Sequence, residues 1–180
     1  MKKLMFALAA VAIATVASAS TVSWGISDAL DTTKFASGNI YLVHGSTIAD
    51  LTDWAAGKTS FAINDVLNEL GGSLAALNTA PNTIVLSGGM GTSTGNSVTT
   101  YDTSSTGNYN VYVVAISGDG ANLAVADSVK TLNIRNVASP ANALYGASEF
   151  STYAAAVPEP TSGLLLLLGV AGLALKRRRA

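Results

Sequence analysis

The chain has 180 residues and no cysteine, which excludes disulfide bonds, thiol nucleophiles and thiolate metal sites. Its net charge of −1 conceals an uneven distribution, because six of its ten basic residues lie near the two ends. Between residues 20 and 157, four basic residues stand against ten acidic ones, a net charge of −6, which argues against nucleic acid as a partner. This span of 138 residues is long enough for one domain with its own core.

The first 19 residues have the three parts of a secretory signal peptide. Two lysines are followed by an apolar run over residues 4–16, and Ala17 and Ala19 are the small residues that signal peptidase requires. The run is too short for a stable membrane-spanning helix. We therefore predict that signal peptidase cleaves before Ser20, an uncleaved N-terminal anchor being the alternative.

The first elements of the domain are two strands and a short helix. Residues 20–26 carry apolar side chains at alternate positions, and residues 39–43 form a short β-type run after a glycine. Thr47 then offers an N-cap, with Asp50 in place of the glutamate of a capping box, and Gly57 closes the turn. These signals predict a short helix after the second strand.

A second helix is predicted by the apolar residues between 63 and 77. They recur with helical spacing and form one stripe, which we expect to face the core. Its members are Ile63, Val66, Leu67, Leu70, Leu74 and Leu77. Gly71 and Gly72 interrupt the pattern, so the helix either ends there and restarts or carries a weak point.

Strand patterns dominate the rest of the domain. Residues 83–87 are apolar and β-branched, and residues 109–117 are apolar on both alternating faces, which predicts a central strand buried on two sides. The segment 88–108 is rich in Gly, Ser, Thr and Asn, with a strand at 98–101 as an option. The run 88–91 at its start predicts a mobile surface loop.

A turn at residues 118–120 follows the central strand. Residues 123–126 and 129–134 predict further strands of the same sheet. Residues 136–157 are small and rich in Ala and Ser, and we expect them to end in a flexible spacer.

The C-terminal tail has three parts in a fixed order. Val157, Pro158, Glu159 and Pro160 precede an apolar run over residues 163–175, and a basic cluster follows, formed by Lys176, Arg177, Arg178 and Arg179. The basic cluster favours the cytoplasmic side, which leaves the domain outside. Thirteen residues span roughly 20 Å as a helix, less than the ~30 Å hydrocarbon core, so this transmembrane helix suits temporary anchorage.

This tail resembles the PEP-CTERM sorting signal over residues 157–179. The resemblance implies export from a bacterial-type cell and cleavage by a membrane-embedded exosortase near the tripeptide. The product would reach the cell surface or the extracellular matrix after transient residence in the inner membrane. An ordinary C-terminal anchor is the alternative. The expected partners are signal peptidase, an exosortase-type enzyme and the membrane, and extracellular polysaccharide is a further candidate.

The predicted fold is therefore mainly β, an antiparallel, sandwich-like sheet with two or three helices in its first half; an α+β arrangement is the alternative. The expected organisation is a signal peptide over 1–19, an exported domain over 20–150, and a spacer with the sorting tail over 151–180.

Candidates for chemistry are few. His44 is the one histidine, and only proximity in sequence links it to Ser46 and Asp50 as a catalytic triad; packing or hydrogen bonding at a strand end is the alternative. A polymer hydrolase would need paired carboxylates, for which the candidates are Asp50 with Asp53 and Asp119 with Asp127.

Calcium is the one ion worth weighing, because it accepts carboxylate and carbonyl oxygens. The candidates are Asp119 with Asn122 and Asp28 with Asp31, but neither pair fits the twelve-residue calcium loop, and Asp and Asn also serve turns. The run from Gly88 to Gly91 lacks the Lys-Ser/Thr ending of a phosphate loop. We therefore predict no metal, no cofactor and a non-catalytic structural or adhesive role, with an exported polymer hydrolase as the alternative.

Overall fold

The structure is a computed structural model that describes residues 19–101 and 106–157. In these ranges it contains β1 (Ser20–Ile26), β2 (Ser37–His44), α1 (Thr52–Ala55), α2 (Ile63–Leu70), β3 (Ser73–Leu74), β4 (Thr83–Ser87), β5 (Gly91–Val98), β6 (Gly107–Ser117), β7 (Asn122–Val125), β8 (Lys130–Ile134), β9 (Pro140–Tyr145), the 3-10 turn η1 (Ala147–Glu149) and β10 (Thr152–Ala155).

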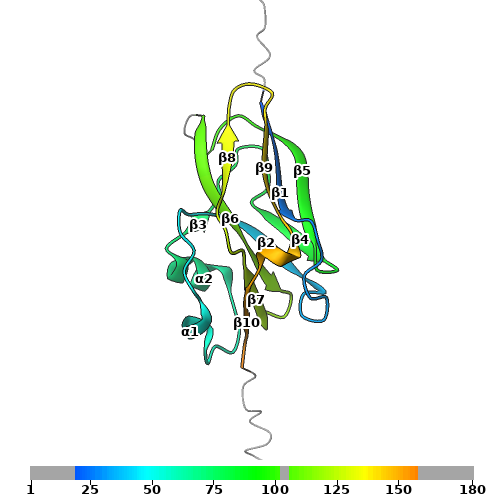
Figure 1. Ribbon diagram of the computed structural model, residues 1–180, viewed down its shortest axis with the longest axis vertical. Helices are drawn as coiled ribbons and strands as arrows, with labels where there is room; N and C mark the ends of the chain where they lie inside the picture. Colours follow the sequence, from blue (N-terminus) through cyan, green and yellow to red (C-terminus); the bar gives the residue numbers. More distant parts are fainter. Residues whose placement is uncertain (1–18, 102–105, 158–180) are drawn as a thin grey trace, which may run out of the picture.

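The strands form two sheets (Figure 1). The small sheet has the order β5-β1-β9, and the large sheet has the order β10-β7-β6-β2-β3, with β4 also paired to β2 and β8 to β6. Neighbouring strands are antiparallel except β1 and β9, which run parallel. The two sheets share one core, to which β1 contributes Trp24 and β6 contributes an unbroken buried run from Val111 to Ser117.

The expectation of a mainly β fold with antiparallel sheets and two or three helices is confirmed, with two α-helices in the described ranges. The strand at residues 20–26, the strand at 83–87 and the central strand β6 lie where the apolar patterns predicted them. The predicted transmembrane helix falls outside the described residues, and within those residues no helix is long and apolar enough to cross a bilayer.

Both helices differ in their bounds from the prediction. The first begins at Thr52 and not after Thr47, because the Asp50 carboxylate accepts hydrogen bonds from the Thr52 amide (2.8 Å) and hydroxyl (2.6 Å) and turns the chain there. The second ends at Gly71, which adopts the left-handed conformation (φ 63°), and it does not restart. Its apolar stripe does face the core, with Val66 and Leu70 buried.

The surface loop predicted for residues 88–91 is a hairpin turn that leads directly into a strand. Residues 88–90 form the tight turn of a hairpin, in which the Ser87 amide donates to the Met90 carbonyl (2.9 Å), and β5 follows directly. Order also extends further toward the C-terminus than expected, because β9, η1 and β10 lie in the segment 136–157.

The described domain has two poles along its long axis (Figure 1). The chain enters β1 at one pole, beside the connection from β8 to β9, and leaves β10 at the other. We call these the entry pole and the tail pole. The Val157 amide donates to the Lys58 carbonyl (2.7 Å), which ties the end of the described chain to the segment after α1.

Candidate functional site

A cavity of about 450 Å³ opens where the end of β2, the turn between α2 and β3, and the start of β6 meet. Its polar lining side chains are His44, Ser46, Thr47, Ser73, Asn108 and Asn110. No Asp, Glu, Lys or Arg lines it. We call this cavity the polar cleft; its volume lies within the ~300–1,000 Å³ typical of small-molecule sites.

Glycines bring the three walls of the polar cleft together. Gly71 ends α2, and the next residue, Gly72, passes so close to β2 and β6 that a Cβ there would lie 2.8 Å from Val43 Cγ1 and 3.0 Å from Tyr112 Oη. A Cβ on Gly45 would lie 2.8 Å from Tyr112 Cε1. Side chains at these positions would therefore push the turn away from the sheet.

Tyr112 lies behind these two glycines. Its side chain is fully buried, and its hydroxyl has no hydrogen-bond partner in the described part of the chain. Burial disfavours the tyrosinate and raises the pKa of Tyr112 to about 12.

One wall of the polar cleft carries two anchored amides. Asn133 Nδ2 donates to Asn108 Oδ1 (2.6 Å), and Thr131 Oγ1 donates to Asn110 Oδ1 (3.1 Å) across the pair formed by β6 and β8. Both asparagines are exposed. Their oxygens are thus engaged, whereas their Nδ2 groups donate no hydrogen bond to the other described residues and are available to a ligand.

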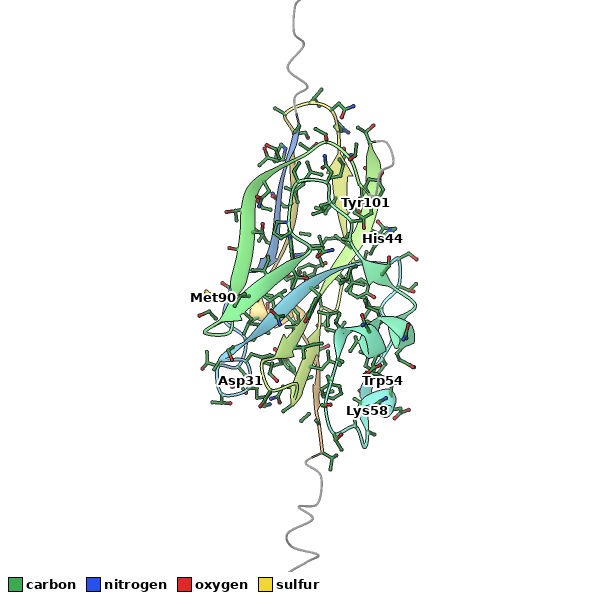
Figure 2. The ribbon with its side chains drawn as sticks, turned by 180° about the vertical axis from the view of Figure 1, so that it is seen from behind. Asp31, His44, Trp54, Lys58, Met90 and Tyr101 are labelled. Atoms are coloured by element: carbon green, nitrogen blue, oxygen red, sulfur yellow. The ribbon has the colours of Figure 1, made fainter. Side chains whose placement is uncertain are left out.

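The side chain of His44 lies at the rim of the polar cleft, against aromatic rings. Its ring meets Tyr101 edge-on at 5.2 Å (Figure 2) and Tyr109 at 6.4 Å, and the two tyrosines stack on each other at 3.9 Å. Its predicted triad partner Asp50 is engaged with Thr52. The structure therefore does not assemble the triad, and it gives His44 the packing role considered as the alternative.

In the candidate pairs, Asp50, Asp119 and Asp127 accept hydrogen bonds from nearby backbone amides and hydroxyl groups. Asp119 Oδ1 accepts from the Ser117 hydroxyl (2.6 Å) and the Ala121 amide (2.9 Å), and these hydrogen bonds, the Ser117 bond foremost, lower the pKa of Asp119. Asp127 accepts from the Ser151 amide and hydroxyl at the other end of β7. Seven residues separate the two, and the four of them that form β7 alone span about 13 Å. Asp53 lies in the first turn of α1, next to the turn that Asp50 forms.

The candidate calcium ligands are also turn residues. Asp31 accepts from the Thr33 hydroxyl (2.6 Å) and amide (3.0 Å), which lowers the pKa of Asp31, and it pairs with Lys34 at 3.5 Å. Asn122 donates to the Lys34 carbonyl, and an Asp28 oxygen lies against Gly146. Over residues 19–101 and 106–157, no group of three or more His, Asp or Glu side chains is placed to hold a metal ion.

The predicted processing residues lie at the two poles. Ser20 opens β1 and is fully buried; its hydroxyl donates to the Arg135 carbonyl (2.9 Å) and accepts from the Arg135 amide (2.7 Å). Ala19 precedes it, and Val157 lies exposed at the tail pole. Ala17, the tripeptide Pro158–Pro160 and the basic cluster 176–179 fall outside the described residues.

Of the residues that line the polar cleft, the sequence singled out His44 and Ser46 for a triad and Thr47 as a helix cap. Asn108 and Asn110 were missed, although the alternation of Asn108, Tyr109 and Asn110 ahead of an apolar run is a signal that the strand begins earlier with one polar face. The glycine pair 71–72, which marks the end of α2, was the other usable signal.

No curated protein and no solved structure matches the chain. The family model that does match describes the PEP-CTERM protein-sorting motif, and it covers residues 156–179. That span contains the Pro-Glu-Pro tripeptide, the apolar run and the basic cluster on which the sequence resemblance rests. The tail of this chain therefore carries a PEP-CTERM sorting motif, the signal of an exported protein that is anchored transiently in the membrane and processed by an exosortase.

Proposed function

We propose that the domain has a non-catalytic structural or adhesive role at the cell surface or in the extracellular matrix. The observation that carries the proposal is the sorting motif at residues 156–179, which directs an exported domain to an exosortase. The acidic charge of the domain, −6 between residues 20 and 157, also suits a soluble surface protein.

The roles of the candidate catalytic residues support a non-catalytic domain. Asp50, Asp119 and Asp127 each accept hydrogen bonds from turn or strand-end groups, and His44 packs on tyrosines. These contacts give each of the four side chains a structural role.

The destination is tested by fractionating cells that export the protein and measuring its intact mass in each fraction. We expect a chain that begins at Ser20 and ends near Val157 in the surface or matrix fraction. In cells that lack the exosortase, the tail should stay attached and the protein should remain in the inner membrane. Finding the uncleaved chain as the stable form in exosortase-containing cells would refute the proposal.

The hydrolase alternative is tested separately, with the full chain on glycan and peptide substrates. We expect no turnover. Turnover that disappears in the Asp50→Ala, Asp53→Ala double variant or in the Asp119→Ala, Asp127→Ala double variant would show that the domain is an enzyme.

A further inference from the structure

A second, smaller cleft continues the polar cleft along β6. It has a volume of about 200 Å³ and shares Asn108 with the polar cleft. Its lining comes from the start of β6 and the end of β8 and consists of Thr106, Gly107, Asn108, Asn133, Ile134 and the exposed Arg135. Hydrogen-bonding side chains therefore line both clefts, from the end of β2 to the end of β8. A strip of this kind can contact several consecutive units of a linear ligand.

We propose that the polar cleft and its continuation bind a stretch of a neutral saccharide chain, with Asn108 and Asn110 as the central donors. The inference rests on the proposed surface role, which it deepens by naming the partner and the site.

The lining of the polar cleft selects the chemistry of the ligand. No carboxylate, ammonium or guanidinium group lines the polar cleft itself, so an ionic ligand would lose its hydration there without a countercharge. The continuation has one charged lining residue, Arg135, which is exposed to solvent. Hydroxyls and amides dominate the lining, and they pair with ligand groups that both donate and accept hydrogen bonds. Each unit of a saccharide provides hydroxyls, which both donate and accept, and ring and glycosidic oxygens, which accept.

The two asparagines are held ready for a ligand before it arrives. Because Asn133 and Thr131 donate to their Oδ1 atoms, the amide planes are fixed and the Nδ2 donors need little further ordering on binding. A site whose donors are already ordered loses less entropy on binding than a flexible one.

The position of the strip keeps it accessible while the tail is in the membrane. His44, at the rim of the polar cleft, lies well away from Lys58, whose carbonyl holds Val157 at the tail pole (Figure 2). The continuation is lined by the start of β6 and the end of β8, and these strand ends lie further toward the entry pole (Figure 1). A polymer can therefore reach the site before and after the tail is removed.

The test uses the full chain in a detergent without a sugar headgroup, because a glycosidic detergent would compete for the site. The probes are hexasaccharides of β-1,4-glucose, β-1,3-glucose and N-acetylglucosamine, together with neutral polysaccharide extracted from the exporting cells. A polyuronate hexamer and an uncharged Gly/Ser peptide of similar length complete the panel. Binding is followed by titration calorimetry.

The decisive variant is Asn108→Asp with Asn110→Asp. Aspartate keeps the oxygen that accepts from Asn133 or Thr131 but replaces the amide donor, so folding is preserved while two donors to the ligand are lost. The matched control is Asn39→Asp with Asn142→Asp, which adds the same charge at exposed strand positions outside both clefts.

We expect saturable binding of at least one neutral saccharide, weakened about tenfold or more in the cleft variant, because each neutral hydrogen bond contributes a factor of roughly 2 to 12. The control variant should bind as the unmodified chain does. The inference is overturned if no neutral saccharide binds, if binding survives the cleft variant, or if only the polyuronate or the peptide binds. If the unmodified protein reaches the surface but binds no neutral saccharide, this inference alone is rejected. If it binds a neutral saccharide but keeps its tail in exosortase-containing cells, the surface role alone is rejected.

Discussion

Tyr112 is a buried hydroxyl without a partner in the described chain, and this makes the stability of the domain sensitive to alkaline pH. Burial raises its pKa from 10.0 to about 12, so the unfolded chain releases the proton first as the pH rises. The unfolded state then binds fewer protons than the folded state, and the free energy of unfolding falls. We expect this loss between pH 10 and about 12, measured by urea denaturation at a series of pH values.

The Tyr112→Phe variant isolates this contribution. Because no hydrogen bond is lost, we expect the free energy of unfolding at pH 7 to stay the same or to rise by about 1 kcal/mol. The alkaline loss should become smaller without vanishing, since burial also raises the pKa of Tyr145. A clear fall in stability at pH 7 would show that the Tyr112 hydroxyl has a partner.

Ser20 fastens the first strand at the entry pole, because its hydroxyl both donates to and accepts from the backbone of Arg135. We expect Ser20→Ala to lower the free energy of unfolding by about 1–3 kcal/mol, since it removes two hydrogen bonds from a buried position. Denaturant unfolding measures the change. The neighbouring Thr21 is exposed, and Thr21→Ala should change stability by less than about 0.5 kcal/mol. Equal effects at the two positions would contradict the role given to the Ser20 hydroxyl.

At the scale of elements, β5 depends on a glycine in its partner strand. Gly25 in β1 has φ 124°, and a Cβ there would lie 2.3 Å from the Gly91 carbonyl oxygen and 2.9 Å from Thr92 Cα. Only a residue without a side chain lets β5 pair with β1 at this point.

We therefore expect Gly25→Ala to destabilise the domain by about 3 kcal/mol or more, through backbone strain together with the clash. Gly95→Ala is the matched control, because Gly95 also has a positive φ (70°) but a Cβ there would meet nothing within 4 Å. It should cost about 1 kcal/mol. Thermal unfolding of the two variants makes the comparison, and similar losses would show that the close approach of β5 does not matter.

The elements that the sequence predicted are those with an apolar pattern of their own. β1 alternates Val22, Trp24 and Ile26, and β6 is a continuous apolar run, so each reveals its burial locally. β5 reads Gly-Thr-Ser-Thr-Gly-Asn-Ser-Val and has no such pattern; it is a strand because β1 and the hairpin turn hold it. The parallel pairing of β1 with β9 joins segments more than a hundred residues apart, which no local signal encodes.

The polar cleft could not be predicted from the sequence for the same reason. His44 is the one histidine and was a candidate on that ground, but its neighbours in space come from β6 and from the turn after α2. The antiparallel register that sets His44 opposite Val111 brings Asn110 to the same edge, and that register follows from the whole sheet. Residue types alone therefore indicated a polar segment and not a cleft.

At the scale of the whole molecule, the folded domain extends to the edge of the sorting tail. β10 pairs with β7, the Ala156 amide donates to the Ala121 carbonyl (2.7 Å), and the Val157 amide donates to the Lys58 carbonyl (2.7 Å). Pro158 of the tripeptide is the next residue. The sequence suggested a flexible spacer here, and the structure places a strand in most of it.

This arrangement makes the end of β10 a barrier to processing. A protease that cleaves near the tripeptide must draw several residues into its active site in an extended form, and here the residues on one side belong to a folded sheet. The rate of cleavage should then depend on how often the end of β10 opens. Inserting about ten Gly/Ser residues between Val157 and Pro158 supplies a flexible segment that needs no opening.

We expect this insertion to speed removal of the tail, measured by pulse-chase labelling in cells that contain the exosortase. The control is the same insertion between Val137 and Ala138, an exposed connection at the entry pole, which should leave the rate unchanged. An unchanged rate with the insertion after Val157 would mean that the tail is removed before β10 joins the sheet. Only the first insertion lengthens the segment between the domain and the tripeptide. If both insertions accelerate removal of the tail, the cause is therefore slower folding of the domain and not the added length.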